Sequence, residues 1–105
     1  MSKVVEINDD NFENEVIRSP VPVLLDFFGE HCGPCRALKP VLVALAESLG
    51  ETAKVATVDV AENELLTNAF KVTVVPTLVV ITNGKVTQRL VGLQNLHLLR
   101  EALGV

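Results

Sequence analysis

Apolar runs and amphipathic segments alternate along this chain, and the alternation predicts strands and helices in turn. Short, mostly apolar runs at 4–7, 21–28 and 53–60 favour β-strands, which need only about four to eight such residues. The run at 21–28 is almost continuously apolar, as in a strand that is covered on both faces. Two further runs, VPTLVVIT and KVTQRLV, flank Asn83-Gly84, a dipeptide typical of a tight β-hairpin.

Between and after these strands, apolar residues recur at spacings of three and four, which predicts helices. The first helix extends from 8–10, whose polar side chains supply N-cap oxygens, to Arg18. The second begins around the cysteines, contains Pro40 and ends at Leu49 before Gly50. The residues expected to face the core are Phe12, Val16 and Ile17, then Leu38, Val41, Leu42, Leu45 and Leu49, then Leu65, Leu66, Ala69 and Phe70, and finally Leu96, Leu99 and Leu103.

The predicted order of elements is βαβαβαββα, which indicates an α/β protein with one domain over residues 1–105. Strands joined through helices are expected to be parallel, and the hairpin adds an antiparallel pair. The prediction is a mixed five-stranded sheet flanked by four helices, with helices on both faces. In such a sheet a site forms where strands end and helices begin, and the cysteines lie at one of these points.

Composition limits the classes of function. The chain has 105 residues, 49% of them hydrophobic, and a net charge of -4, which suits one domain with a substantial core. No apolar run approaches the roughly 18 residues of a membrane helix, and acids stand where a signal peptide is apolar, so we expect a cytoplasmic protein. The acidic excess and the lack of a Lys/Arg cluster argue against binding to nucleic acid or to a membrane surface.

Both cysteines of the chain, Cys32 and Cys35, lie within one short motif. A disulfide that closes so small a loop restricts the unfolded chain little, so stabilisation is a poor reason for it. A structural zinc site needs four ligands, and the chain adds only His31, which abuts Cys32, and His97. Arg36 stands where a c-type haem site has histidine, and an iron–sulfur cluster would need cysteines from a second chain. We therefore expect no metal, and a structural or incidental pair remains the alternative to a redox-active one.

Five features stand in register along the chain. They are Cys32-Gly33-Pro34-Cys35, the preceding strand that ends in Asp26-Phe27-Phe28, Pro40 in the following helix, Val75-Pro76-Thr77, and the Asn83-Gly84 hairpin with Gly92 after it. Together they resemble the thioredoxin family over essentially the whole chain, in spacing as well as in residue type. The resemblance implies the thioredoxin fold and a redox-active Cys32–Cys35 disulfide, with no metal and no organic cofactor.

The residue types of the motif also suit this chemistry on physical grounds. A thiolate, not a thiol, attacks a disulfide, and Cys32 at a helix N-terminus faces unpaired backbone N–H groups and the positive end of the helix dipole. Cys35 lies about one helical turn further on, within reach of Cys32. Gly33 lets the backbone approach a partner, and Pro34 fixes φ where no donor is needed. We expect Cys32 to act as nucleophile and Cys35 to resolve the mixed disulfide.

Asp26 is the only charged residue of the strand at 21–28. From the strand alone it can be an acid at a strand end, wetted by solvent; the resemblance implies a buried carboxyl near Cys35. Burial raises the pKa of a carboxyl, which makes Asp26 a candidate proton acceptor when Cys35 ionises. Most family members have lysine where this chain has Thr57, so we hypothesise that the pKa of Asp26 is higher than is typical of the family.

His31 stands where the family usually has tryptophan. One interpretation is a surface substitution without a chemical role. The other is a partial positive charge that eases thiolate formation at Cys32 below neutral pH.

Pro76 alone is compatible with an ordinary trans proline that opens an edge strand. The resemblance implies a cis proline that faces the cysteines and shapes a peptide-binding groove. The backbone of Val75 would then be free to pair with a bound substrate, and Gly92 would border the same groove.

These features predict a monomeric protein thiol–disulfide oxidoreductase that reduces disulfides in target proteins. The resemblance implies re-reduction by a thioredoxin reductase, either a flavin-dependent, NADPH-linked enzyme or a ferredoxin-linked one. Two alternatives stay open: a more oxidising thiol oxidase or isomerase, and a binding subunit that uses the fold as a scaffold. Gly33-Pro34 between the cysteines favours the reductase, whereas His31 leaves the oxidase open.

Overall fold

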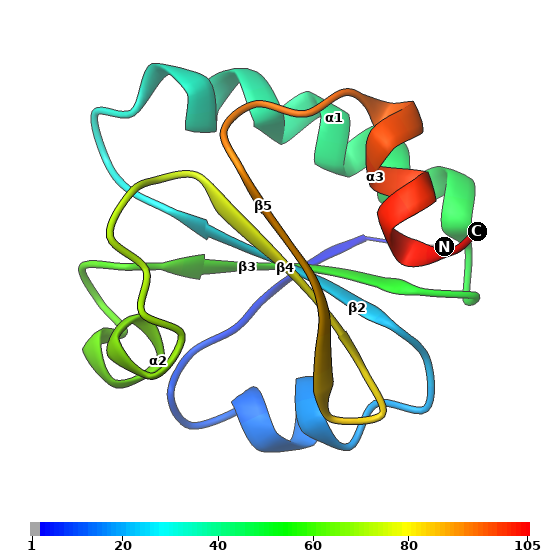
Figure 1. Ribbon diagram of the computed structural model, residues 1–105, viewed down its shortest axis with the longest axis horizontal. Coiled ribbons are helices and arrows are strands. Elements are labelled where there is room, and N and C mark those ends of the chain that lie inside the picture. Colours follow the sequence, from blue (N-terminus) through cyan, green and yellow to red (C-terminus); the bar gives the residue numbers. More distant parts are fainter. Residues whose placement is uncertain (1–2) are drawn as a thin grey trace.

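The computed structural model describes residues 3–105, which form a five-stranded sheet with helices on both faces (Figure 1). In chain order the elements are β1 (Val4–Glu6), the short π-helix η1 (Glu13–Ile17), β2 (Val23–Phe28), α1 (Gly33–Leu49), β3 (Lys54–Asp59), α2 (Glu64–Ala69), β4 (Thr77–Thr82), β5 (Lys85–Val91) and α3 (Leu96–Leu103). This order confirms the predicted alternation of strands and helices and the α/β class.

The strands lie in the order β1-β3-β2-β4-β5, so β2 is central. β3 is parallel to both of its neighbours, β1 and β2, whereas β4 is antiparallel to β2 and to β5. The mixed sheet is as expected, but the expectation that strands joined through helices are parallel is wrong for β4, which follows β3 through α2.

The length of α2 explains the direction of β4. Six residues of helix span about 9 Å, whereas the six residues of β3 extend about 20 Å. The helix is too short to return the chain to the other end of the sheet. β4 therefore starts at the end where β2 and β3 finish, with Thr77 opposite Phe27. Figure 1 shows α2 beyond the tip of β3.

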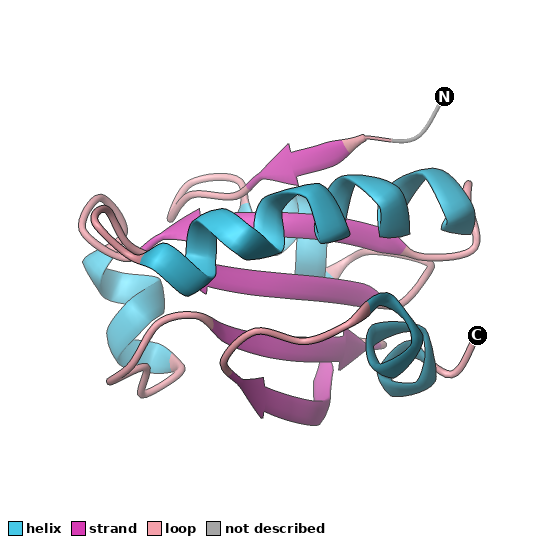
Figure 2. Ribbon diagram, turned by 90° about the horizontal axis from the view of Figure 1, so that it is seen from above, coloured by secondary structure: helices cyan, strands magenta, loops and turns pink. Residues whose placement is uncertain are grey.

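Each face of the sheet has its own hydrophobic core. α1 and α3 pack on one face against strand residues that include Leu24, Val55 and Leu78, and Figure 2 looks onto this face. η1 and α2 cover the other face, where Leu25 and Phe27 are buried. Because side chains alternate along a strand, β2 supplies both cores and is buried as its apolar run predicts. Among residues 3–105, no helix is long and apolar enough to cross a bilayer.

Three residues expected to face the core do not. Ile17 is 38% exposed, Leu65 is 73% exposed, and Ala69 is exposed as well. All three lie in helices of five or six residues, and each of these helices buries only one residue, Val16 in η1 and Leu66 in α2. A spacing of three and four locates the buried face of a long helix, but one or two turns give it too few repeats to choose between adjacent apolar residues.

The polar residues expected to cap the first helix make two kinds of hydrogen bond, one local and one to α2. The side-chain carbonyl of Asn8 accepts the backbone N–H groups of Asp10 at 2.9 Å and of Asn11 at 2.8 Å, as a local cap does. A carboxylate oxygen of Asp9 instead accepts the N–H of Leu66 at 3.2 Å, in the first turn of α2. Asn63 completes the link, since its side-chain oxygen accepts the N–H of Asp9 at 3.1 Å. The N-terminal loop thereby positions α2.

The hairpin between β4 and β5 has the geometry that its sequence predicts. Asn83 and Gly84 both have positive φ, 53° and 75°, as a type I′ turn requires. β5 is an edge strand, and it begins and ends next to β4, with Lys85 opposite Thr82 and Val91 opposite Thr77.

We predict that Leu24→Ala lowers the free energy of unfolding by about 3 kcal/mol, because Leu24 is fully buried in the central strand and its loss leaves a cavity. Urea unfolding followed by far-UV circular dichroism measures it, since the chain has no Trp or Tyr as a fluorescent probe. The matched control is Val86→Ala on β5, where Val86 is 54% exposed, with an expected change within about 0.5 kcal/mol. Equal effects of the two substitutions would contradict the assignment of the core.

Candidate active site

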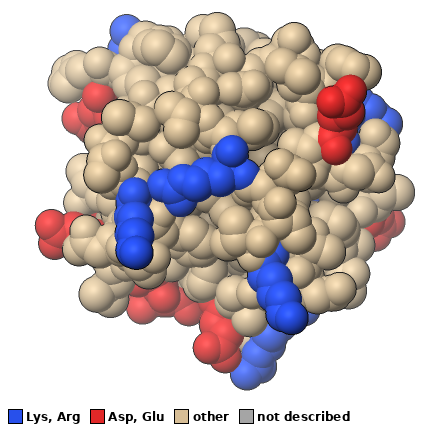
Figure 3. Space-filling model, in the orientation of Figure 1, with Lys and Arg blue, Asp and Glu red and all other residues tan. Residues whose placement is uncertain are grey.

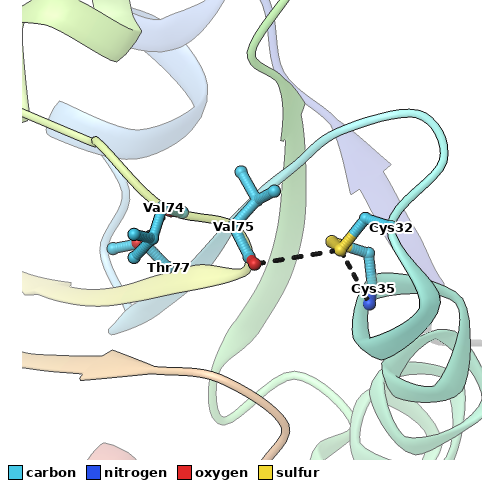
Figure 4. Close-up of a disulfide and its surroundings, with 5 residues drawn as sticks. All are labelled: Cys32, Cys35, Val74, Val75 and Thr77. Atoms are coloured by element: carbon cyan, nitrogen blue, oxygen red, sulfur yellow. Dashed lines mark hydrogen bonds between the residues drawn. A yellow bond between two sulfur atoms is a disulfide. The ribbon is translucent and has the colours of Figure 1, made fainter.

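The cysteine pair lies at the N-terminus of α1. Cys32 has extended backbone angles and is the N-cap residue, and the helix proper begins at Gly33. The two sulfurs are joined in a disulfide, with the Cα atoms 5.2 Å apart. The backbone N–H of Cys35 donates to Sγ of Cys32 at 3.1 Å (Figure 4). One of the N–H groups that a helix leaves unpaired is thus directed at this sulfur.

The two cysteines differ in exposure. Cys35 is 2% exposed, whereas Cys32 is only partly buried. Pro34 occupies the first turn of α1 and is exposed. A Cβ built on Gly33 would meet no atom of the chain within 4 Å, so the surface beside Cys32 is open. A reagent or partner therefore reaches Cys32 before it reaches Cys35.

The segment before β4 lies directly opposite Cys32. The Val75–Pro76 peptide bond is cis, as the resemblance implied. The carbonyl oxygen of Val75 lies 3.8 Å from Sγ of Cys32 (Figure 4). A disulfide sulfur has no proton, so in this state the pair is a contact, whereas a thiol at Cys32 could donate to the same oxygen.

This segment is fixed at its C-terminal end by its neighbours. The hydroxyl of Thr77 donates to the carbonyl of Val74 at 2.7 Å, and the N–H of Gly92 donates to the carbonyl of Pro76 at 2.9 Å. Gly92 has φ of 90°, a conformation that favours glycine. Within residues 3–105, the backbone of Val75 belongs to no strand pairing and makes no backbone hydrogen bond. The structure thus brings Val75, Pro76 and Gly92 together, as expected.

Asp26 is buried in the middle of β2. It is 2% exposed, and its Oδ1 has no hydrogen-bond partner among the described residues. Desolvation raises the pKa of this carboxyl from its ordinary value of 3.8 to about 7. Asp26 and Cys35 line the same cavity, of about 300 Å³. The predicted burial of Asp26 is therefore confirmed, and it is the cause of the raised pKa.

Three further polar residues line the same cavity, and of these only Thr57 was expected near Asp26 from the sequence. Thr57 lies opposite Asp26 in the pairing of β2 and β3, and Glu6 and Lys39 complete the polar lining. Lys39 follows Cys35 by four residues on α1, so the two share a helix face. The four-residue spacing between Cys35 and Lys39 is therefore the sequence feature from which a position of Lys39 near the site could have been predicted. Its Nζ lies 5.7 Å from the ring centroid of Phe28.

Gly29 is a second residue near the site that was not predicted from the sequence. A Cβ at this position would lie 3.4 Å from Cγ2 of Val75 and 3.8 Å from Cγ2 of Val60. A Cβ here would be in van der Waals contact with the segment that faces Cys32. The contact joins parts of the chain that are too distant in sequence for a local pattern to reveal.

His31 has a left-handed backbone, with φ of 56°. Its side chain is 92% exposed, and Nε2 lies 4.0 Å from a carboxylate oxygen of Glu30. No hydrogen bond joins the imidazole to either cysteine within residues 3–105. The structure therefore places His31 next to Cys32 in the chain without directing its ring at the sulfur. His97 on α3 is equally remote, with its side chain 80% exposed and Nε2 3.1 Å from Glu101.

The arrangement is suited to sulfur exchange. In the part of the chain that the structure describes, no group of three or more His, Cys, Asp or Glu residues is placed to hold a metal. The site instead combines an accessible sulfur at a helix N-terminus, a buried second sulfur, and a carboxyl of raised pKa in the cavity behind it. This combination defines the class of thiol–disulfide oxidoreductases.

Comparison with known proteins agrees with this class. The profile of the thioredoxin family matches residues 3–104. The thioredoxin of Haemophilus influenzae is 41% identical over 92 residues, covering 88% of this chain and 86% of its own. That of Chlorobaculum thiosulfatiphilum is 37% identical over 90 residues, covering 86% and 83%. That of Rickettsia prowazekii is 33% identical over 91 residues, covering 87% of each chain.

The chain belongs to the thioredoxin family. It is a thiol–disulfide oxidoreductase with a vicinal cysteine pair, and the predicted fold and class of activity are confirmed.

We predict that Asp26→Asn makes the protein more stable at alkaline pH. The folded pKa of about 7 exceeds the ordinary 3.8, so the folded protein holds this proton more tightly than the unfolded chain. The parent therefore loses stability as the pH rises from about 4 to 7, by about 4 kcal/mol in all. The free energy of unfolding of Asp26→Asn, measured relative to that of the parent, should therefore increase by about 3 kcal/mol between about pH 4.5 and pH 8.

Urea unfolding at several pH values measures this difference, with the exposed Asp10→Asn as the control that should follow the parent. Carbon NMR of the Asp26 carboxyl gives the midpoint of its titration directly. An ordinary acid titration, or parallel stability curves for Asp26→Asn and the parent, would refute the raised pKa and with it the hypothesis about Thr57.

Proposed function

We propose that this thioredoxin reduces disulfides in target proteins, with Cys32 as the nucleophile and Cys35 as the resolving thiol. The unequal exposure of the two sulfurs at the start of α1 is the observation that carries the proposal. A substrate disulfide can collide with Cys32, while Cys35 stays enclosed until a mixed disulfide has formed.

The proposed reaction has two exchange steps. The Cys32 thiolate attacks one sulfur of the substrate disulfide, so a Cys32–substrate bond forms and the other substrate sulfur leaves as a thiolate. The Cys35 thiolate then attacks Cys32, which forms the Cys32–Cys35 disulfide and releases the second substrate thiol. Two electrons pass from the protein to the substrate, and the released thiolates take up protons from the solvent or from the protein.

We assign to Asp26 the role of proton acceptor for Cys35. The pKa of its carboxyl is raised to about 7 by desolvation, so near neutral pH the carboxylate and the acid are both populated. A base of this kind is matched to the pH at which it works. The shared cavity supports the assignment, since it gives the proton a route between Asp26 and Cys35.

We further propose that Val75, Pro76 and Gly92 form the substrate groove. The unpaired backbone of Val75 can exchange hydrogen bonds with an extended peptide next to its cysteine, as in recognition by strand addition. Gly33 and Pro34 would form the facing wall, where no side chain obstructs approach. In this arrangement the peptide backbone supplies affinity that does not depend on the substrate's sequence.

We propose that three residues adjust how readily the Cys32 thiol ionises. Gly33 and Pro34 define the turn at which the helix N-terminus meets the sulfur, and His31 would add a partial positive charge at low pH. The evidence for His31 is the weakest of the three, because its side chain is 92% exposed and within residues 3–105 no hydrogen bond joins its ring to the sulfur.

The family implies protein disulfides as substrates. We propose a thioredoxin reductase as the electron donor, and a monomer in the cytoplasm as the working form. The 105 residues would act as a single domain, with the Cys32–Cys35 disulfide in place of a cofactor.

We predict that Cys32→Ser abolishes catalysis of insulin reduction by dithiothreitol and leaves only the uncatalysed rate, because the accessible nucleophile is lost. Reduced Cys35→Ser, mixed with insulin in the absence of dithiothreitol, should accumulate a mixed disulfide between Cys32 and insulin, visible by non-reducing mass spectrometry. Serine is close in size to cysteine, and circular dichroism checks that both variants fold. Retention of turnover in Cys32→Ser would contradict the proposal, as would a mixed disulfide on Cys35 instead.

A redox titration of the parent against glutathione separates the reductase from the oxidase. A midpoint well below that of glutathione is expected, and an oxidising midpoint with slow insulin reduction would favour the thiol oxidase or isomerase.

A further inference from the structure

The segment that faces Cys32 is anchored at its N-terminal end by a residue outside the site. Arg89 lies on β5, opposite Val79 of β4. Paired residues of antiparallel strands share a face, and Val79 belongs to the core under η1 and α2, so Arg89 projects on the α2 side. Its Nη1 donates to the carbonyl oxygen of Phe70 at 2.7 Å and its Nη2 to that of Lys71 at 3.1 Å. Figure 3, seen from the side of the β5 edge strand, shows basic side chains among uncharged ones.

These two carbonyls lie where α2 ends and the segment toward Val75 begins. Phe70 is the C-cap residue of α2, and Lys71 after it has a left-handed backbone with φ of 54°. Side chains other than Asn and Asp adopt this conformation reluctantly, so the turn needs support. A guanidinium that bridges two successive carbonyls holds their peptide planes in one relative orientation. Arg89 therefore contributes, with the backbone hydrogen bonds of the turn, to the direction in which the chain leaves α2.

The turn is also held by backbone hydrogen bonds from the N–H of Lys71 to Asn68 and from the N–H of Val72 to Thr67, both at 3.0 Å, and Val72 packs against the core. Between Val72 and β4 the segment has few other restraints. Its far end is held by the hydrogen bonds of Thr77 to Val74 and of Gly92 to Pro76. Residues 73–76 pair with no strand of the sheet. The aromatic ring of Phe70 packs in the core against Phe27, with ring centroids 5.4 Å apart, and this contact does not involve Arg89. Loss of the arginine should thus free the segment without unfolding α2.

We propose that Arg89 is a positioning residue for substrate: by bridging the carbonyls of Phe70 and Lys71 it holds the Val75 backbone in the orientation that a peptide must meet at Cys32. The inference rests on the proposed groove. Arg89 touches neither sulfur in the structure, and its effect is expected on substrates that use the groove and not on sulfur chemistry as such.

The experiment compares two disulfides with the reduced protein: insulin, and bis(2-hydroxyethyl) disulfide, which is uncharged and has no peptide backbone. For Arg89→Gln we expect the rate constant for insulin to fall about five-fold, with the small disulfide within about two-fold of the parent. Amide hydrogen exchange of Val72, whose N–H donates to Thr67 directly after the anchored turn, should become faster, and the reduction potential should not change. The control Lys85→Gln removes one positive charge from the same strand and should match the parent.

The variant Arg89→Lys distinguishes an effect of the hydrogen-bond bridge from an effect of the positive charge alone. A lysine keeps the charge but lacks the planar pair of donors, so it should behave like Arg89→Gln. Full rescue by lysine would overturn the proposal, because it would mean that charge attracts the substrate. Equal losses with both disulfides, or unchanged insulin reduction and unchanged exchange at Val72, would also overturn it. Failure of the parent itself to reduce insulin would instead refute the proposed function, and exchange at Val72 would still test the anchor.

Discussion

The site depends on one hydrogen bond, from the backbone N–H of Cys35 to Sγ of Cys32. It exists because the chain turns into α1 directly after Cys32, so an unpaired helical N–H is directed at the sulfur. The same group, together with the positive end of the helix, stabilises a negative charge on that sulfur once the disulfide is opened. The sheet, the facing segment and the buried acid are useful only if this sulfur is ionised and accessible.

The rest of the fold serves to place other groups around this helix end. The central strand β2 delivers Asp26 to the cavity behind Cys35, and the apolar residues on both sides of it prevent solvation of the carboxyl. β4 starts at the same end of the sheet because α2 is too short to return the chain, and this brings Val75 opposite Cys32. A six-residue helix and a reversed strand thus create the second wall of the site.

The residues that carry strong local constraints were predictable from the sequence. The cysteine motif, the Asn83-Gly84 turn and the apolar stripe of α1 each act over a few residues, and each forms as predicted. The direction of β4 and the exposure of Ile17 and Leu65 depend on packing between elements, which a local pattern does not contain. Lys39 could have been found from its spacing to Cys35 on α1. The contact of Gly29 with Val75 and the bridge from Arg89 to Phe70 and Lys71 join distant parts of the chain, so only the assembled structure reveals them.

The most direct measurement is the rate at which iodoacetamide alkylates each thiol of the fully reduced protein near neutral pH, with the two sites resolved by peptide mass spectrometry. Cys32 should react at least about ten-fold faster than Cys35 and faster than the same residue in the urea-denatured chain, because only Cys32 combines an ionised sulfur with access to the reagent. Two equally slow thiols, indistinguishable from those of the denatured chain, would contradict the account.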